Sequence, residues 1–231
     1  MKILIVSGFL GAGKTTFIKR LARNVDQRFA ILENEYGAAG IDGARLGQNR
    51  QGTQKNVWEM TEQCICCIGK KDFAASVLTI ANVVDQEYLI VEPTGVGSLA
   101  RIIENLRQIE YERIQLLSPV TIVDVYSYRR YMAEYPELYQ DQIRSADTII
   151  VSKTEACQAE EKQRIQKFLQ EINPQAKIIT DYASTMTRED YQSLLLGGRY
   201  EKEVQDTQSG EKMPETFSFE NIRMEAPETL W

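Results

Sequence analysis

Three cysteines lie within four residues of this chain, at Cys64, Cys66 and Cys67. The fourth cysteine of the sequence is Cys157, and there is no histidine. Thiolates are soft ligands that favour Zn²⁺ and related ions, and a structural zinc site usually closes with four protein ligands. Because three cysteines without a histidine cannot supply the usual sets, the cluster predicts an open metal site, shared or completed by a carboxylate or water. A redox disulfide and buried, inert cysteines are the alternatives.

A phosphate-binding motif occupies residues 8–16, directly after the apolar run 3–6. It fits G-x-x-x-x-G-K-S/T in the strand, loop and helix context that this motif requires. Backbone amides and a helix N-terminus would bind phosphate oxygens, Lys14 would add charge at the β- and γ-phosphates, and Thr15 could ligate Mg²⁺. The motif predicts a nucleoside triphosphate site formed by Gly8, Gly11, Ala12, Gly13, Lys14, Thr15 and Thr16.

Glu92 directly follows another apolar run, and its carboxylate could take part in the chemistry at the phosphates. Residues 89–91 are apolar and lead into Glu92-Pro-Thr-Gly95. In nucleoside triphosphatases, a carboxylate at this place orients the Mg²⁺ shell, and a following glycine amide can sense the γ-phosphate. Glu92 and Gly95 are therefore catalytic candidates beside Lys14 and Thr15, and a simple helix-capping role for Glu92 is the alternative.

A base-reading turn is predicted after the apolar run 148–151. Ser152-Lys153-Thr-Glu155 matches the guanine-reading element Asn-Lys-x-Asp with both polar ends changed. Glu155 offers the same carboxylate on a longer stem, whereas Ser152 cannot reproduce the two-ended amide of Asn. Guanine recognition by Ser152, Lys153 and Glu155 is plausible, and a polar turn that reads no base is the alternative.

The elements that must position these residues alternate along the chain. Short apolar runs predict strands at 3–6, 29–32, 88–91, 120–123, 148–151 and 177–179. Apolar residues spaced three and four apart predict helices at 15–23, 72–84, 99–108 and 160–172. Such alternation favours a doubly wound α/β fold with a mostly parallel sheet. A long, glycine-rich loop is expected at 37–52.

Composition narrows the class of protein. The net charge is −6 at pH 7, which argues against a nucleic-acid partner. No apolar run approaches the length of about 20 residues that a membrane span needs, so no membrane association is expected. The chain is predicted to be cytoplasmic, and small ligands or protein partners are favoured.

The order and spacing of these motifs, together with Glu33-Asn-Glu-Tyr-Gly37, resemble the CobW family, within the CobW/HypB/UreG class of P-loop GTPases. The resemblance implies that GTP is bound and hydrolysed with Mg²⁺, and that GTP and GDP states are coupled to holding and delivering Zn²⁺ or Co²⁺. A client metalloenzyme or its maturation factor would be the partner. The resemblance assigns residues 33–37 to the first switch, 92–95 to the second switch, and the three cysteines to the metal.

The resemblance also sets the expected domain organisation. Residues 1–185 would form the P-loop GTPase domain, and residues 186–231 a polar linker and a truncated C-terminal segment, a short appendage.

Glu35, or else Asp42, is nominated as the missing metal ligand. Turnover without a partner is expected to be slow, because no arginine finger or second-switch glutamine is visible.

Two other functions stay open at this point. One is a nucleotide-switched regulatory binding module that transfers no metal, and the other is an ATPase of the same fold. A homodimer is also possible.

Overall fold

The computed structural model describes residues 1–33, 59–61, 77–78, 80–81 and 86–204. The cysteine motif, Glu35, the whole of the loop expected at 37–52, and residues 205–231 lie outside the described residues. Of the helix predicted at 72–84, residues 77, 78, 80 and 81 are described and helical.

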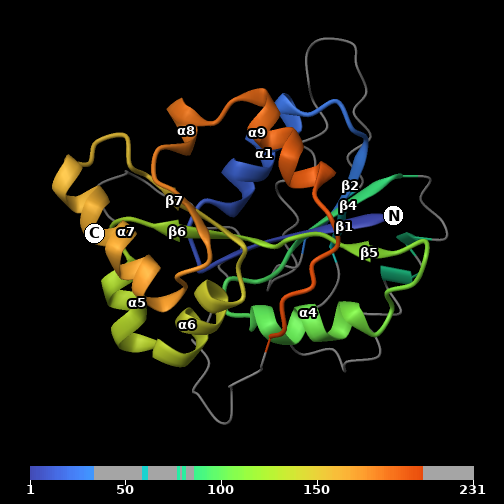
Figure 1. Ribbon diagram of the computed structural model, residues 1–231, viewed down its shortest axis with the longest axis horizontal. Coiled ribbons are helices and arrows are strands. Elements are labelled where there is room, and N and C mark those ends of the chain that lie inside the picture. Colours follow the sequence, from blue (N-terminus) through green and yellow to red (C-terminus); the bar gives the residue numbers. More distant parts are fainter. Residues whose placement is uncertain (34–58, 62–76, 79, 82–85, 205–231) are drawn as a thin grey trace, which may run out of the picture.

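A parallel sheet forms the centre of the described structure (Figure 1). Its strands pair in the order β3-β2-β4-β1-β6-β7-β8, and β5 pairs with β1 off this path. The bounds are β1 (Lys2–Gly8), β2 (Phe29–Glu33), β3 (Glu59–Thr61), β4 (Tyr88–Glu92), β5 (Gln115–Leu116), β6 (Val120–Asp124), β7 (Thr148–Ser152) and β8 (Lys177–Ile179). All six predicted strands and the doubly wound α/β P-loop fold are confirmed.

Helices cover both faces of the sheet. Figure 1 shows α1, α8 and α9 on one side and α4, α5 and α6 on the other. The helices that lie wholly within the described residues are α1 (Lys14–Asn24), α4 (Leu99–Arg107), α5 (Tyr128–Glu134), α6 (Pro136–Arg144), α7 (Ala159–Ile172), α8 (Tyr182–Thr185) and α9 (Arg188–Leu196). The helices predicted at 15–23, 99–108 and 160–172 agree with α1, α4 and α7 to within one residue at each end.

Coverage on both faces explains why the strands are apolar throughout. Successive side chains of a strand point to opposite faces, so Ile3 and Ile5 pack against α4, while Leu4 and Val6 pack in the cluster that contains α1. All four side chains are fully buried. Each such burial stabilises the fold by about 1.5–3 kcal/mol relative to exposure, so β1 is a rigid base for the loop that follows it.

The packed core extends beyond residue 185, where the polar linker was expected to begin. Helix α9 starts with a capping box between Thr187 and Asp190, and its Tyr191 and Leu195 belong to the same buried cluster as Phe17 of α1. Tyr200 is also buried and donates a hydrogen bond from its hydroxyl to the carbonyl of Ser145 at 2.9 Å. Residues 188–200 are therefore part of the same folded unit as the sheet.

No helix in the described ranges combines the length and the apolar character needed to cross a membrane.

Candidate functional site

The phosphate loop connects the end of β1 to the start of α1. Gly13 is the N-cap of α1 with φ 98°, a left-handed conformation that glycine adopts at little cost. At Gly8 a Cβ would lie 2.4 Å from the carbonyl oxygen of Ile122 on β6, so only glycine lets the loop pass so close to the neighbouring strand. The amide of Ala12 donates to the carbonyl of Phe9 at 3.1 Å and closes the turn. The predicted phosphate loop therefore has the strand, loop and helix geometry that anion binding requires.

Three of the predicted catalytic residues lie together at this loop. The hydroxyl of Thr15 donates to Oε1 of Glu92 at 2.9 Å, although the two residues are 77 positions apart in the sequence. The ammonium of Lys14 donates to the carbonyl of Gly8 at 3.0 Å. A hydroxyl and a carboxylate at this distance are oxygen ligands of the kind that Mg²⁺ prefers, and both stand at the N-terminal end of α1. The residues present fit a magnesium ion beside a bound phosphate.

The loop that follows Glu92, residues 93–98, touches the phosphate loop. A Cβ at Gly95 would lie 2.4 Å from the backbone nitrogen of Leu10 and 2.8 Å from the carbonyl carbon of Phe9. This approach admits glycine alone, because the atoms in the way are backbone atoms. The fourth predicted catalytic residue is thus in contact with the phosphate loop.

Aromatic residues of α5 and α6 support the other side of the phosphate loop. The ring of Phe9 lies 4.2 Å from that of Tyr131 and 5.7 Å from that of Tyr139, measured between centroids. The hydroxyl of Tyr131 also donates to the carbonyl of Leu10 at 3.2 Å. Burial raises the pKa of the Tyr139 hydroxyl well above its usual value, so this side chain stays neutral. Tyr131 and Tyr139 therefore belong to the packing that holds the phosphate loop.

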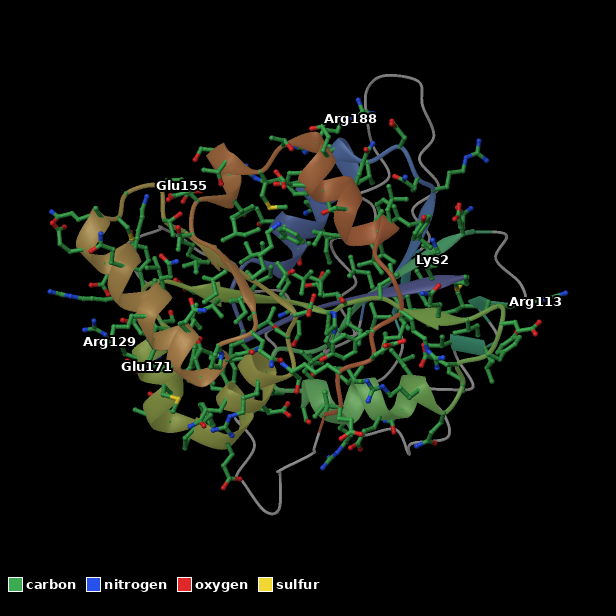
Figure 2. The ribbon with its side chains drawn as sticks, in the orientation of Figure 1. Lys2, Arg113, Arg129, Glu155, Glu171 and Arg188 are labelled. Carbon is green, nitrogen blue, oxygen red and sulfur yellow. The ribbon has the colours of Figure 1, made fainter. Side chains whose placement is uncertain are left out.

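The predicted base-reading turn is tied to the same loop. The hydroxyl of Ser152 donates to the carbonyl of Ala12 at 2.6 Å. Lys153 adopts a left-handed backbone conformation with φ 61°, which costs a non-glycine residue about 1–3 kcal/mol and is typical of functional sites. Its ammonium lies 2.7 Å from a carboxylate oxygen of the buried Asp124. Glu155 is exposed at the surface of the turn between β7 and α7 (Figure 2).

Asp124, the last residue of β6, contacts both the segment before α5 and Lys153. It accepts from the backbone amide of Tyr126 at 2.8 Å and from the hydroxyl of Ser127 at 3.0 Å, so it does organise the start of α5. Its ion pair with Lys153 additionally fixes the turn that is predicted to read the base. The two roles are combined in one carboxylate.

The predicted transition-metal ligands cannot be placed in the same way. Cys64, Cys66, Cys67 and Glu35 lie outside the described residues. Within the described part of the chain, no group of three or more histidine, cysteine, aspartate or glutamate side chains is arranged to hold a metal ion. Cys157 is partly buried against the cluster formed by α5, α6 and α7, which agrees with a structural role.

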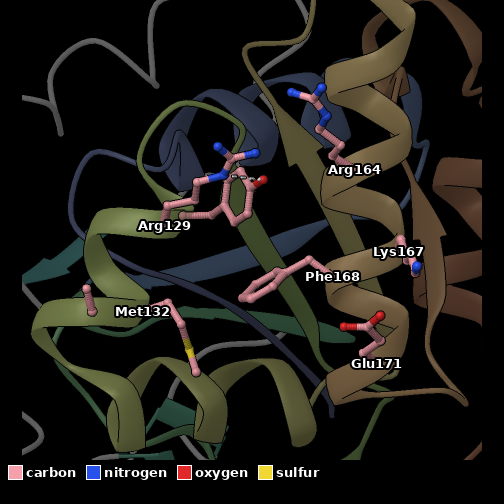
Figure 3. Close-up of a pocket in the computed structure, with 8 residues that line it drawn as sticks. Arg129, Met132, Arg164, Lys167, Phe168 and Glu171 are labelled. Carbon is pink, nitrogen blue, oxygen red and sulfur yellow. Dashed lines mark hydrogen bonds between the residues drawn. The ribbon is translucent and has the colours of Figure 1, made fainter.

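A separate groove of about 470 Å³ lies between α5 and α7 (Figure 3). Met132 and Phe168 supply apolar side chains, and Arg129, Arg164 and Lys167 supply positive charge. None of its lining residues belongs to the predicted nucleotide site. The groove is therefore distinct from the chemistry at the phosphate loop.

Comparison with known proteins agrees with this geometry. The model of the CobW/HypB/UreG nucleotide-binding domain matches residues 2–180. The chain belongs to this family. Among curated relatives, the zinc chaperone YeiR of Escherichia coli K12 is 30% identical over 178 residues, covering 76% of this chain and 53% of the relative. The zinc-regulated GTPase metalloprotein activator 1 of Dictyostelium discoideum is 25% identical over 218 residues, covering 78% and 45%.

Solved structures of other proteins share the fold of this chain. The Zn(II)-bound YjiA GTPase from Escherichia coli superposes with a TM-score of 0.63 at 21% identity, over 91% of this chain and 67% of that one. HypB from Helicobacter pylori in complex with nickel gives a TM-score of 0.54 at 19% identity, over 84% and 81%. At these identities the similarity establishes the shared fold. The chain spans about half the length of the curated relatives that it matches.

Proposed function

We propose that this chain binds and hydrolyses GTP with Mg²⁺ and couples its nucleotide state to the binding and delivery of a transition metal of the Zn²⁺ or Co²⁺ type. The observation that carries the nucleotide part is the 2.9 Å contact between Thr15 and Glu92 at the start of α1. Lys14 and the amides of residues 8–16 would bind the phosphates. Thr15 and Glu92 would hold and orient Mg²⁺, which neutralises phosphate charge when bound.

The strand register supports a link between nucleotide and metal. Glu33 of β2 pairs with Glu92 of β4, and Thr61 of β3 pairs with Glu33. The first switch, residues 33–37, begins at Glu33, and Cys64 follows three residues after Thr61. The chain therefore leaves the sheet toward the switch and toward the cysteine motif at the edge that carries Glu92. Rearrangement of these segments by the γ-phosphate could assemble the thiolates, and hydrolysis could release the metal.

The relatives support the metal part of the proposal. Several carry the names zinc chaperone or zinc-regulated GTPase metalloprotein activator. On this basis Cys64, Cys66, Cys67 and Glu35 are proposed as ligands of the delivered ion, and a client metalloprotein as its acceptor. Guanine as the base is the finer part of the proposal, and it rests on Ser152, Lys153 and Glu155.

The test uses one cysteine variant and one matched control. Cys66→Ser should lower Zn²⁺ and Co²⁺ affinity at least tenfold, whereas Cys157→Ser should leave it unchanged, because Cys157 packs against the α5–α7 cluster. Affinities are measured on anaerobically purified protein with GDP and with a non-hydrolysable GTP analogue. Equal metal affinity in the two nucleotide states would refute the coupling, and tighter ATP than GTP binding would refute the choice of base.

A further inference from the structure

The glycine that contacts the phosphate loop needs an external restraint. Gly95 must lack a side chain, because a Cβ would lie 2.4 Å from the backbone of Leu10. Glycine is also the residue with the most backbone freedom, so a loop with Gly95 and Gly97 would not hold one conformation by itself. A loop that senses the γ-phosphate with a backbone amide has to keep that amide in a fixed direction.

The side chain of Gln142 on α6 supplies such a restraint. Its amide nitrogen donates to the carbonyl of Gly95 at 3.1 Å and to the carbonyl of Gly97 at 2.9 Å. Gln142 is 1% exposed, so both bonds are made away from water. An amide group has two donor protons, and two carbonyl acceptors use both. This orientation is fixed, since a reversed amide would place its oxygen against two carbonyl oxygens.

The restraint is anchored in the sheet. The hydroxyl of Thr121 on β6 donates to the backbone carbonyl of Gln142 at 2.9 Å. The neighbouring Asp141 accepts from the amide of Leu99 at 2.7 Å and so binds the start of α4, where the loop ends. Two consecutive side chains of α6 therefore hold both the middle and the end of loop 93–98.

The same helix face also reaches the phosphate loop. Tyr139 lies three residues before Gln142, a spacing that places both on one side of a helix. The ring of Tyr139 is 5.7 Å from that of Phe9 in the phosphate loop. One face of α6 thus contacts the phosphate loop through Tyr139 and loop 93–98 through Gln142.

We infer that Gln142 is a positioning residue for the proposed GTPase reaction, which it serves by fixing the Gly95–Gly97 backbone against the phosphate loop. This inference rests on the proposed function, because it assigns the loop to the γ-phosphate. Gln142 touches no substrate in this role. It determines how well the protein distinguishes GTP from GDP and how fast the bound GTP is hydrolysed.

The deciding variant is Gln142→Met, which keeps the length of the side chain and removes both donors. The matched control is Asn173→Leu. Asn173 is also a buried amide. It donates to carbonyls at and just after the C-terminal end of α6, those of Ile143 at 2.8 Å and Ala146 at 2.9 Å, and no bond from it to residues 93–98 is seen. Both variants should lower the unfolding temperature. Only Gln142→Met should alter the response to the γ-phosphate.

The measurements are the affinities for GDP and for a non-hydrolysable GTP analogue, and single-turnover hydrolysis with Mg²⁺. For Gln142→Met we expect the ratio of analogue to GDP affinity and the hydrolysis rate each to fall about tenfold, with GDP affinity within twofold of wild type. If Gln142→Met does not fold, Gln142→Glu keeps the shape and sets a carboxylate against the two carbonyls, so the same losses are expected.

The outcomes separate this inference from the proposed function. A wild-type ratio and rate in the folded Gln142 variant would overturn the inference alone, and an equal loss in Asn173→Leu would overturn it by tracing the effect to general loosening of α6. Failure of the wild-type protein to bind or hydrolyse GTP would overturn the proposed function, and this inference with it.

Discussion

Replacing Gly95 with alanine tests the contact between the two loops most directly. The added Cβ would lie 2.4 Å from the nitrogen of Leu10, whereas real Cβ contacts essentially never fall below 3.0 Å. The two loops must therefore separate by at least the difference, 0.6 Å. All three nearest atoms belong to the backbone, so no flexible side chain can absorb the movement. The backbone of one or both loops has to shift, so the Gly95 amide and the phosphate loop lose their relative position.

A shift of this size is large on the scale of catalytic geometry. A misplacement of about 1 Å can cost about 100-fold in rate. For Gly95→Ala we expect GTP hydrolysis to fall about 10- to 100-fold, which corresponds to about 1.4–2.7 kcal/mol of activation free energy. The assay is single-turnover hydrolysis with Mg²⁺, after circular dichroism and a cooperative melting curve have shown that the variant is folded.

The control for this experiment is Gly198→Ala. At Gly198 a Cβ would meet nothing within 4 Å, so the same chemical change should leave the hydrolysis rate as it is. A folded Gly95→Ala protein with a rate within twofold of wild type would show that residues 93–98 do not constrain the phosphate loop.

Three further predictions concern other parts of the fold. Leu195→Ala should lower the free energy of unfolding by about 2–5 kcal/mol and Tm by roughly 5–15 °C. The control Leu196→Ala, at an exposed position, should change it by less than about 0.5 kcal/mol. Equal melting temperatures for the two variants would exclude α9 from the core. Ser152→Ala removes the bond to the phosphate loop and should weaken GDP binding about fivefold in a fluorescence titration, and unchanged affinity would contradict a role for that bond. Hydrogen bonds from the Thr187 amide and hydroxyl lower the pKa of Asp190. The stabilisation of α9 by this carboxylate is therefore complete above about pH 4 and is lost as the pH falls through the lowered pKa. The difference in Tm between wild type and Asp190→Asn should shrink over that range, and a constant difference would refute the cap.

The fold was predictable because its signals are local. Each predicted strand is a short apolar run, since each is buried on both faces, and the amphipathic spacing of α1, α4 and α7 is equally direct. The phosphate loop was predictable because glycine, lysine and threonine at fixed spacing have a specific chemical reason. Strands β3 and β5 were missed, because runs of three and two residues carry no detectable period.

The end of the folded unit was harder to predict from the sequence. Helix α9 buries Tyr191 and Leu195 but also begins with three charged residues, and two glycines follow it. Such a segment has the composition of a linker. Its place in the core depends on the surface that α1 presents to it, which is a tertiary property.

Gln142 shows most clearly what the sequence could not reveal about the site. Glutamine is usually exposed, so Gln142 in a charged segment predicts a solvated helix face. In the structure this amide is buried and donates to two glycine carbonyls of loop 93–98. Gly95 is required by its close approach to the backbone of Leu10, and the Gln142 amide restrains the backbone at that glycine. The motif therefore identifies the residues proposed to act on the nucleotide, while the residue proposed to hold them in place follows only from the packing of α6 against the sheet.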